Sequence, residues 1–503
     1  MRRATISYVS IVAFLRVVLA SAALALGGCT GLYFKDAGQA PEVHYDLASL
    51  PYFDYWTGIV FNGEKVGFSH FAIRKDPGAP RHEVRSEASI VLRFLGLEKT
   101  ILLRSRDVIN PDLTLVEFDY WFRVDDSELQ VAGRREGEAL VSRITTGGVT
   151  TAQRLPAPGR LYPSSIINLY PVIHGLEVGR EHKYVVYHGQ TQSLAEVTQG
   201  IAGYEKSDLY AGNAFKVETA MHGQRVTSWI GPDGKLRFEL AMYGALISFL
   251  EDAESAARYL ALSSLNKRES LVEYSLVRPD RAIDKPRGVS GLRVALSGAP
   301  ALPPSDGGQR CTREGAEIVC AMGRAAAGTE GGAGPPSGAL RERYLRPSVS
   351  VQSADPAIRE LARTIAGSAG TDAERIARIL RWLDENIEKV AIDAYSALDV
   401  LKRRKAECQG HAYLYAALAR ALGVPTRVVN GLVYSDQFGG FLYHSWAESL
   451  VGSGWQAVDP IFGQARADAT HLKLVEGEDL ADLVPLMEWV GKLQLRVLEV
   501  ERR

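Results

Sequence analysis

Three residues in the carboxyl-terminal part of the chain have side chains that can together perform acyl transfer. Cys408 stands in the run Ala-Glu-Cys-Gln-Gly-His, His444 follows in Tyr-His-Ser-Trp, and Asp459 follows in Val-Asp-Pro. A thiol attacks a carbonyl as a thiolate, so it needs a base, and that base needs an acceptor that fixes its tautomer. The residue types and their order therefore predict a thiol-dependent acyl-transfer site.

Cys408 is expected at the amino end of a helix. Good helix formers fill residues 413–422, and Gly423 and Pro425 end the run. The helix dipole and the free backbone N–H groups would favour a thiolate at this place, and the same groups could hold an oxyanion.

A hairpin is expected to bring the other two residues together. Strand-like residues 441–451 and 455–459 flank a Gly-Ser-Gly turn. A two-residue loop at 452–453 places Trp446 opposite Asp459, so that His444 lies on the same face and diagonal to the carboxylate. A three-residue loop would put the pair on opposite faces. In this role Asp459 only orients the imidazole, and its replacement by Asn should leave stability nearly unchanged.

Helices precede this site. Pro356 stands at a position where a helix can begin, and residues 371–374 form a capping box ahead of an apolar stripe. The stripe consists of Ile376, Ile379, Leu380, Leu383 and Ile387. A further short helix is expected at 397–403.

Residues 406–460 resemble the core of the transglutaminase-like superfamily, which has a papain-like thiol fold. The matching pieces are the Cys at a helix start, the phrase Ala-Ala-Leu-Ala-Arg-Ala-Leu-Gly-Val-Pro-Thr-Arg at 416–427, His444 before Ser-Trp-Ala-Glu, and a Trp ahead of Val-Asp-Pro. The resemblance implies a domain over residues 347–503, with Cys408 as nucleophile, His444 as general acid/base and Asp459 as the orienting carboxylate. Family members often have Gly just before the Cys, where this chain has Ala-Glu.

The amino-terminal portion is predicted to be β structure over residues 45–290. Asn62-Gly63 and the turn at 232–234 separate apolar runs, as in antiparallel hairpins. The fold class is therefore α+β, with an antiparallel β-rich domain before the transglutaminase-like domain. No catalytic cluster stands out in the β-rich part. Its histidines, among them His44, His70 and His222, are interpreted as surface or structural residues.

Residues 1–28 are interpreted as a lipoprotein signal peptide. A charged start is followed by an apolar stretch and by Leu-Gly-Gly before Cys29, which resembles the bacterial lipobox. Cys29 would then carry the lipid and anchor the protein in a membrane of the bacterial cell envelope, on the periplasmic side, at the outer membrane. The alternative is an ordinary secretory signal that ends near a Cys.

The remaining cysteines fit an oxidising compartment. Cys311 and Cys320 lie nine residues apart with a Gly between them and are expected to form a disulfide across a hairpin. The alternative is a pair of unrelated thiols. The hairpin falls in a presumed linker at 291–346, whose Gly-rich stretch at 328–338 is too poor in apolar residues to pack. Cys408 is left unpaired.

The expected activity is acyl transfer or hydrolysis on peptide or protein amides, with no cofactor and no metal. Lys and Arg number 58 against 59 Asp and Glu, without a block of like charge, so no nucleic-acid partner is expected. A zinc site is a weaker alternative, with Cys408, His411, His444 and Asp459 as possible ligands. A second alternative is that Cys408, His444 and Asp459 are structural residues that share no site. The third is a non-catalytic envelope scaffold or peptide-binding module that keeps a relic site.

Overall fold

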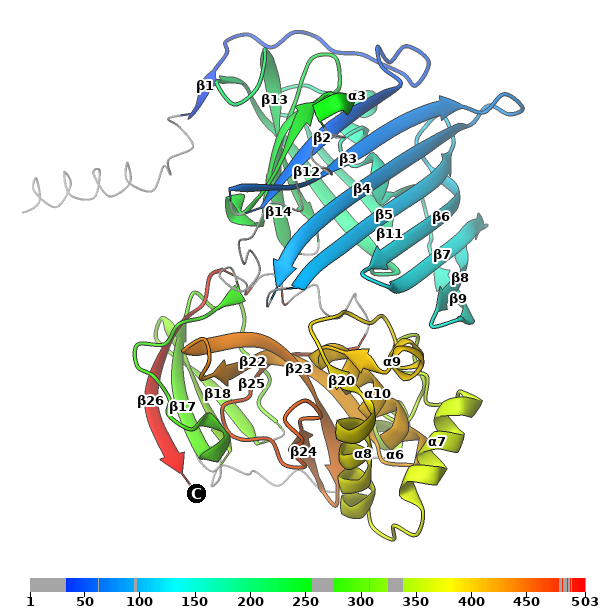
Figure 1. Cartoon of the computed structure of the whole chain (residues 1–503). Helices are drawn as coiled ribbons and strands as arrows, with labels where there is room; N and C mark the ends of the chain where they lie inside the picture. The colour runs from blue at the N-terminus through cyan, green and yellow to red at the C-terminus, as the bar shows by residue number, and fades with distance from the viewer. Residues whose placement is uncertain are drawn as a thin grey trace, which may run out of the picture.

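The computed structural model confirms the α+β class, with strands dominating the amino-terminal part (Figure 1). It describes residues 33–502 apart from 62, 95–96, 222, 256–274, 307, 324–337, 479–481, 483–485, 487–488 and 490. The signal peptide, Cys29, Asn62 and His222 lie outside the described residues. Within the described ranges, no helix has the length and apolar character required to cross a membrane.

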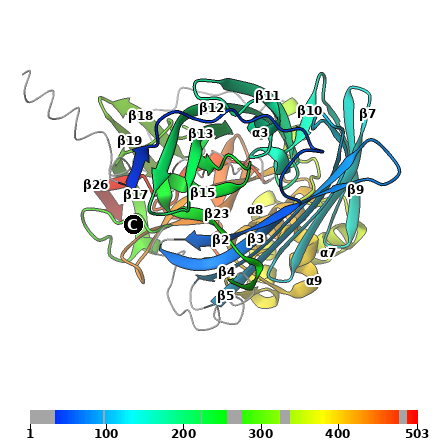
Figure 2. The ribbon, with the colours of Figure 1, turned by 90° about the horizontal axis from the view of Figure 1, so that it is seen from above.

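A 16-stranded sheet forms the amino-terminal domain. Its strands are β1 (Phe34–Asp36), β2 (Asp54–Phe61), β3 (Glu64–Lys75), β4 (His82–Phe94), β5 (Leu97–Ile109), β6 (Leu115–Val124), β7 (Ser127–Glu136), β8 (Ala139–Thr146), β9 (Val149–Pro156), β10 (Leu161–Pro163), β11 (Glu181–His188), β12 (Ser193–Ser207), β13 (Asn213–Met221), β14 (Gln224–Ile230), β15 (Leu236–Ala241) and β16 (Leu246–Glu251). The order runs from β10 through β16 to β2 and on to β9, with β1 beside β12. Pairing is antiparallel except between β10 and β11. The strands curve around a common interior (Figure 2).

The short helices of this domain lie between its strands. They are η1 (Ser164–Ile166), α3 (Tyr170–His174) and η2 (Met242–Gly244). Local turn chemistry fixes the hairpins, as expected from the sequence. Gly63, between β2 and β3, and Gly234, between β14 and β15, both have positive φ, which glycine adopts without a steric penalty.

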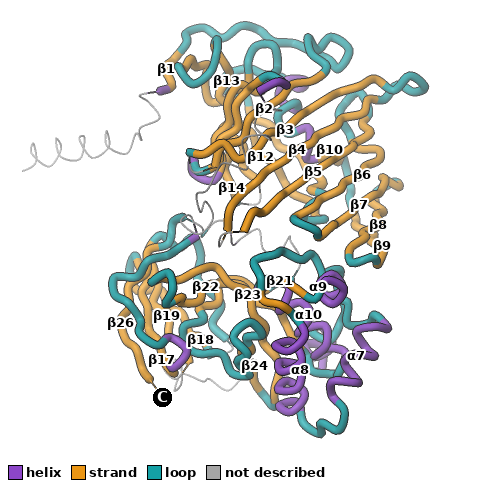
Figure 3. Tube along the Cα trace, viewed as in Figure 1, coloured by secondary structure: helices purple, strands orange, loops and turns teal. Residues whose placement is uncertain are grey.

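The carboxyl-terminal domain combines helices with two four-stranded sheets and a two-stranded sheet of β20 and β21. Its helices are η4 (Pro286–Gly288), α6 (Gly338–Arg343), α7 (Pro356–Ala366), α8 (Asp372–Asn386), α9 (Ala397–Arg403) and α10 (Cys408–Ala421). Its strands are β17 (Val289–Ser297), β18 (Gln309–Glu314), β19 (Glu317–Gly323), β20 (Glu388–Lys389), β21 (Lys405–Ala406), β22 (Thr426–Ser435), β23 (Gly440–Val451), β24 (Gly454–Val458), β25 (Leu472–Glu476) and β26 (Gln494–Arg502). Helices α7 to α10 gather on one side of the sheet β24-β23-β22-β25 (Figure 3).

Local signals start these helices where the sequence indicated. Pro356 is the first residue of α7, and Thr371 caps α8 through a reciprocal capping box with Glu374. The apolar stripe of α8 is buried against α10, which is itself almost wholly buried. The packing holds the amino end of α10, and therefore Cys408, in a fixed place.

The presumed linker at 291–346 differs from the expectation. Strands β17, β18 and β19 form a sheet with β26, the last strand of the chain, in the order β18-β19-β17-β26. Cys311 and Cys320 face each other on β18 and β19 and form a disulfide. The Gly-rich stretch before α6 lies almost entirely outside the described residues. Sequence reasoning missed the sheet because the partner of β17 comes from the far end of the chain.

The two domains meet through buried polar contacts. Ser127 donates a hydrogen bond from its hydroxyl to Asp399 at 2.7 Å and accepts the backbone N–H of Tyr395 at 2.9 Å. Lys99 of β5 pairs with Asp393 at 2.5 Å. These contacts join β5 and β7 to residues 393–399, and α9, which begins in this segment, packs against α10, the helix that carries Cys408.

Candidate active site

Cys408 is the first residue of α10 and is half-buried. Its thiol donates a hydrogen bond to Oε2 of Glu407 at 2.9 Å. Glu407 is the N-cap of the helix, and its Oε1 accepts the backbone N–H of Gly410 at 3.2 Å. The Glu407 carboxylate therefore binds a backbone N–H group in the first turn of the helix. The sequence analysis expected the N–H groups of this turn to be free to hold an oxyanion.

The expectation of a resting thiolate is wrong in this structure. Burial, together with the charge and hydrogen bond of Glu407, raises the pKa of the Cys408 thiol well above its ordinary value. A backbone group of Ser445 acts in the opposite direction but does not outweigh these effects. The neutral thiol is therefore the favoured form at neutral pH.

His444 is supplied by the hairpin of β23 and β24, whose register agrees with the two-residue loop. Val451 pairs with Gly454 and Ala447 with Val458, which continues to Trp446 opposite Asp459. Nε2 of His444 lies 2.8 Å from Oδ2 of Asp459. This contact leaves Nδ1 as the ring nitrogen that can serve a thiol.

Asp459 is fully buried and accepts four hydrogen bonds. Oδ1 accepts the backbone N–H groups of Ile461 at 2.7 Å and Phe462 at 3.1 Å. Oδ2 faces His444 and also Nε2 of His471, at 2.9 Å. Burial alone would raise the pKa of Asp459, but the two imidazoles hold that pKa well below its usual range. The carboxylate is a structural centre as well as the partner of His444.

His471 is a site residue that the sequence analysis missed. It is buried just before β25, and its Nδ1 donates to the backbone carbonyl of Asp468 at 3.0 Å. Burial favours the neutral ring, but hydrogen bonds to Asp459 and Asp468 raise the pKa of His471 to about 9. The sequence around His471 gives no clear signal of this role, because its partner Asp459 is brought to it only by the fold.

The zinc alternative takes a different form in the structure. Nε2 of His444, Oδ2 of Asp459 and Nε2 of His471 lie within 4.8 Å of one another, as three ligands of a metal would. In this structure, both imidazoles form hydrogen bonds with the Asp459 carboxylate through these atoms. His411 is buried in α10, where its Nδ1 lies 3.0 Å from the Glu407 carbonyl, so the Cys-x-x-His spacing does not place it in this group.

The two tryptophans of the motif pack near the site without reaching the thiol. Trp446 is buried beside His471, with ring centroids 5.2 Å apart. Trp455 lies under the Arg427 guanidinium at 4.2 Å. Neither residue is among those that line the cavity at Cys408. Packing is therefore the role that their contacts support.

Cys408 and His444 line one cavity of about 860 Å³. The cavity lies between the β-rich sheet and the carboxyl-terminal domain, because residues of both domains form its walls. Phe462, whose backbone binds Asp459, also lines it. A substrate carbonyl can therefore reach the thiol and the imidazole from the same space.

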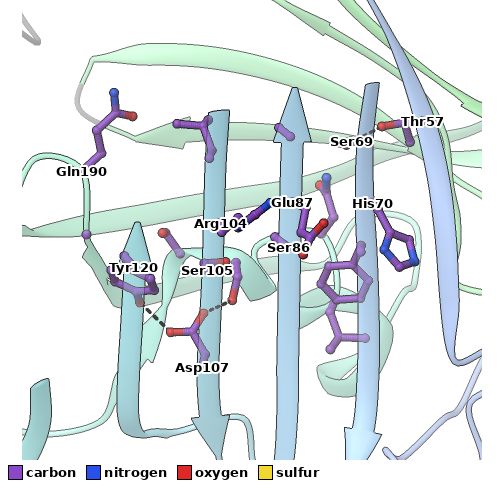
Figure 4. A pocket seen from close by; sticks show the side chains of 18 of the residues that line it. Thr57, Ser69, His70, Ser86, Glu87, Arg104, Ser105, Asp107, Tyr120 and Gln190 are labelled. Carbon is purple, nitrogen blue, oxygen red and sulfur yellow. Dashed lines mark hydrogen bonds between the residues drawn. The ribbon is translucent and has the colours of Figure 1, made fainter. Parts of the chain in front are cut away.

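A second, smaller cavity of about 330 Å³ lies inside the β-rich domain (Figure 4). Asp107 on its wall accepts hydrogen bonds from Tyr120 at 2.5 Å and Ser165 at 2.6 Å, and burial raises the pKa of Asp107 to about 7. His70 also lines the cavity, where it stacks on Trp56 with centroids 4.1 Å apart. His70 has the structural contacts that the sequence analysis expected.

Comparison with known protein families finds a match that covers the helices and strands that carry Cys408 and His444. The model of the transglutaminase-like superfamily matches residues 359–460, from α7 to the residue after Asp459. Kyphoscoliosis peptidase of Mus musculus is 28% identical over 144 residues, which are 26% of this chain and 22% of that protein. The Homo sapiens protein is 30% identical over 129 residues, 23% of this chain and 19% of its own length. The chain thus spans about a fifth of these relatives.

Solved structures give weaker matches. A candidate cysteine protease from Cytophaga hutchinsonii has a TM-score of 0.28 at 17% identity, and the match covers 43% of this chain and 86% of that one. A beta-barrel-like protein of unknown function from Brucella abortus has a TM-score of 0.32 at 9% identity, with 40% and 95% covered. The family assignment therefore rests on the matched residues 359–460, which include Cys408 and His444. Over residues 359–460, the carboxyl-terminal domain matches the transglutaminase-like superfamily.

Proposed function

We propose that this protein is a thiol-dependent acyltransferase or hydrolase in which Cys408 is the nucleophile, His444 the general acid/base and Asp459 the orienting carboxylate. The observation that carries the proposal is the placement of His444. One of its ring nitrogens is fixed by a buried carboxylate at 2.8 Å, and the ring shares a cavity with a thiol at a helix start. This is the relation between base, orienting group and nucleophile that acyl transfer requires.

Because the pKa of Cys408 is raised, the thiol loses its proton during the attack and not before it. Nδ1 of His444 takes the thiol proton as sulfur bonds to the substrate carbonyl carbon, and Asp459 stabilises the resulting imidazolium. His444 then passes the proton to the leaving amine, whose bond to carbon breaks and leaves a thioester on Cys408. Water or a second amine attacks the thioester and returns a proton to the sulfur through the same imidazole.

Glu407 has a defined part in this cycle. At rest it accepts the thiol proton in a hydrogen bond of 2.9 Å, so attack requires the thiol to exchange Glu407 for His444. Until this exchange, the hydrogen bond to Glu407 keeps the cysteine neutral and therefore less easily oxidised. Glu407 is a positioning residue, since it acts through Cys408.

We infer a peptide or protein amide as substrate and the bacterial cell envelope as location. The names of the two matched relatives, both peptidases, support the substrate class. The lipobox-like sequence before Cys29 supports an anchored position at the periplasmic side of a membrane, and the disulfide between Cys311 and Cys320 fits an oxidising compartment.

The test is incubation of the mature protein with a glutamine-containing peptide, with and without a labelled primary amine, followed by mass analysis. Label joined to the glutamine identifies transamidation, whereas a shortened or deamidated peptide identifies hydrolysis. Both products should disappear in Cys408→Ala. Equal product from wild type and Cys408→Ala would overturn the thiol mechanism.

Two other readings have specific tests. Zinc bound by His444, Asp459 and His471 would make activity sensitive to a chelator and restorable by Zn²⁺, whereas the thiol mechanism predicts no change. A non-catalytic binding module would retain the peptide without converting it, and its affinity would be the same in wild type and Cys408→Ala.

A further inference from the structure

The cavity at Cys408 has two walls, one from each domain. The wall from the β-rich sheet is made of apolar side chains. These are Phe61, Val66, Ile90, Leu92, Ile101, Met242 and Leu246. The opposite wall, from the carboxyl-terminal domain, carries Cys408, His444, Glu407 and Asp393 together with further apolar side chains such as Leu442 and Phe462. The cavity is therefore lined largely by apolar side chains, and most of its polar groups lie on the wall that carries the thiol.

The wall from the β-rich sheet presents mainly apolar side chains to a ligand, and these cannot form hydrogen bonds with a peptide backbone. Strand β3 pairs with β2 and β4, and β4 pairs on its other edge with β5, so their backbone groups are used within the sheet. A peptide against this wall would leave N–H and C=O groups without partners, at a substantial free-energy cost. A hydrocarbon chain has no such groups, and its transfer from water to an apolar wall is favourable.

Charged groups of the lining meet at the border between the domains. Lys99 of β5 reaches across the domain interface and pairs with Asp393 at 2.5 Å, and both act on Glu407 beside the thiol. Leu92 on β4 is the direct cross-strand partner of Lys99. Ile90 and Leu92 pack against a buried apolar cluster that consists of Ile59, Phe61 and Val66. The apolar wall therefore begins next to Lys99 and continues into the β-rich domain.

We propose that this cavity binds the hydrocarbon chain of an amphipathic acyl substrate, with the reacting carbonyl at Cys408 and the chain against the sheet wall. The proposal rests on the thiol mechanism proposed above and extends its substrates from peptide amides to amides or esters that bear a long apolar chain. A cavity of about 860 Å³ has the size of a site for such a ligand, since small-molecule pockets span roughly 300–1,000 Å³.

The chemistry balances with water as the second reactant. The Sγ–carbon bond forms while the bond from the carbonyl carbon to the leaving oxygen or nitrogen breaks, and His444 carries the thiol proton to the leaving group. Water then cleaves the thioester, releases a carboxylic acid and restores the thiol. The chain stays against β3 and β4 through both steps, which keeps the carbonyl at the sulfur.

The test uses 4-nitrophenyl esters with acyl chains from acetyl to decanoyl. For wild type, kcat/KM should rise with chain length, by about two- to four-fold for each methylene that enters the cavity. Leu92→Gln should flatten this rise, so that kcat/KM falls more for the decanoyl ester than for the acetyl ester. Val91→Gln is the matched control, because the neighbouring side chain on β4 does not line the cavity. Leu246→Trp should shorten the longest chain that still improves turnover.

A binding measurement separates this proposal from the catalytic one. The inactive Cys408→Ala protein should bind a fluorescent fatty acid at one saturable site, decanoate should displace it, and Leu92→Gln should weaken binding at least about ten-fold. Acetyl turnover that depends on Cys408 but shows no chain-length trend would overturn the hydrocarbon site and leave the thiol mechanism standing. No Cys408-dependent turnover, with saturable binding intact, would overturn the mechanism and support the site. Thermal melts of each variant show that it is folded.

Discussion

Replacing Asp459 by Asn should destabilise the fold as well as slow the reaction. The carboxylate is fully buried and holds two imidazoles and two backbone N–H groups. Asn can keep the bonds to the backbone through its oxygen, but its NH₂ group then faces His444 and His471. Removing one partner of a buried ionic group typically costs about 3–5 kcal/mol. This differs from the sequence-based expectation of nearly unchanged stability, which treated Asp459 as partner of one histidine only.

The pH dependence identifies the cause of the loss. The pKa of His471 is raised to about 9 in the folded protein, against 6.5 for the free side chain. Protonation of His471 therefore stabilises the folded protein fully below pH 6.5, and this stabilisation is lost as the pH rises through 9. The difference between the two pKa values corresponds to about 3 kcal/mol of unfolding free energy. Asp459 is charged in both the folded and the unfolded state across this range and adds no slope.

Urea unfolding of wild type, Asp459→Asn and His471→Gln at pH 6.5 and pH 9 is the assay. Wild type should lose about 3 kcal/mol between the two pH values relative to His471→Gln, which lacks the titrating group. Asp459→Asn should lie about 3 kcal/mol below wild type at pH 6.5 and approach it at pH 9. An Asp459→Asn protein within about 0.5 kcal/mol of wild type at pH 6.5 would refute the account of this carboxylate.

Three further outcomes are expected. Asp107→Asn should be more stable than wild type at pH 8 by up to about 4 kcal/mol and lose that advantage near pH 4, because burial raises the pKa of Asp107 to about 7 and the charged form is the unfavourable one; chemical unfolding at both pH values checks the sign. Glu407→Gln should make Cys408 react with iodoacetamide several-fold faster at neutral pH, since it removes the charge that raises the thiol pKa; an unchanged or slower rate would assign the raised pKa to burial alone. Cys29→Ser should release the mature protein from membranes, and an amino-terminal peptide without acyl mass in wild type would end the lipoprotein interpretation.

The parts of the fold that the sequence predicted are those that local chemistry determines. The capping box at Thr371, the first residue of α7 at Pro356 and the loop register that aligns His444 with Asp459 depend on neighbours a few residues away. Such signals remain readable without knowledge of the tertiary structure.

The features that escaped prediction depend on contacts between distant segments. His471 joins the site because β25 pairs with β22, and β17 gains strand β26 from the end of the chain. The raised pKa of Cys408 depends on where the Glu407 side chain turns and on how deeply the thiol is packed. The cavity at Cys408 requires the β-rich sheet to lie against the carboxyl-terminal domain, and the pair of Lys99 and Asp393 joins the two.

The most direct test of the central claim is the capture of the acyl-enzyme. Wild type is mixed with 4-nitrophenyl acetate, quenched within a single turnover and analysed by intact mass and peptide mapping. The account predicts one acetyl group, bound as a thioester to Cys408, and a formation rate at least about 100-fold lower in His444→Ala. An acetyl group on another residue, or an equal rate in His444→Ala, would contradict the assignment of Cys408 and His444 as nucleophile and base.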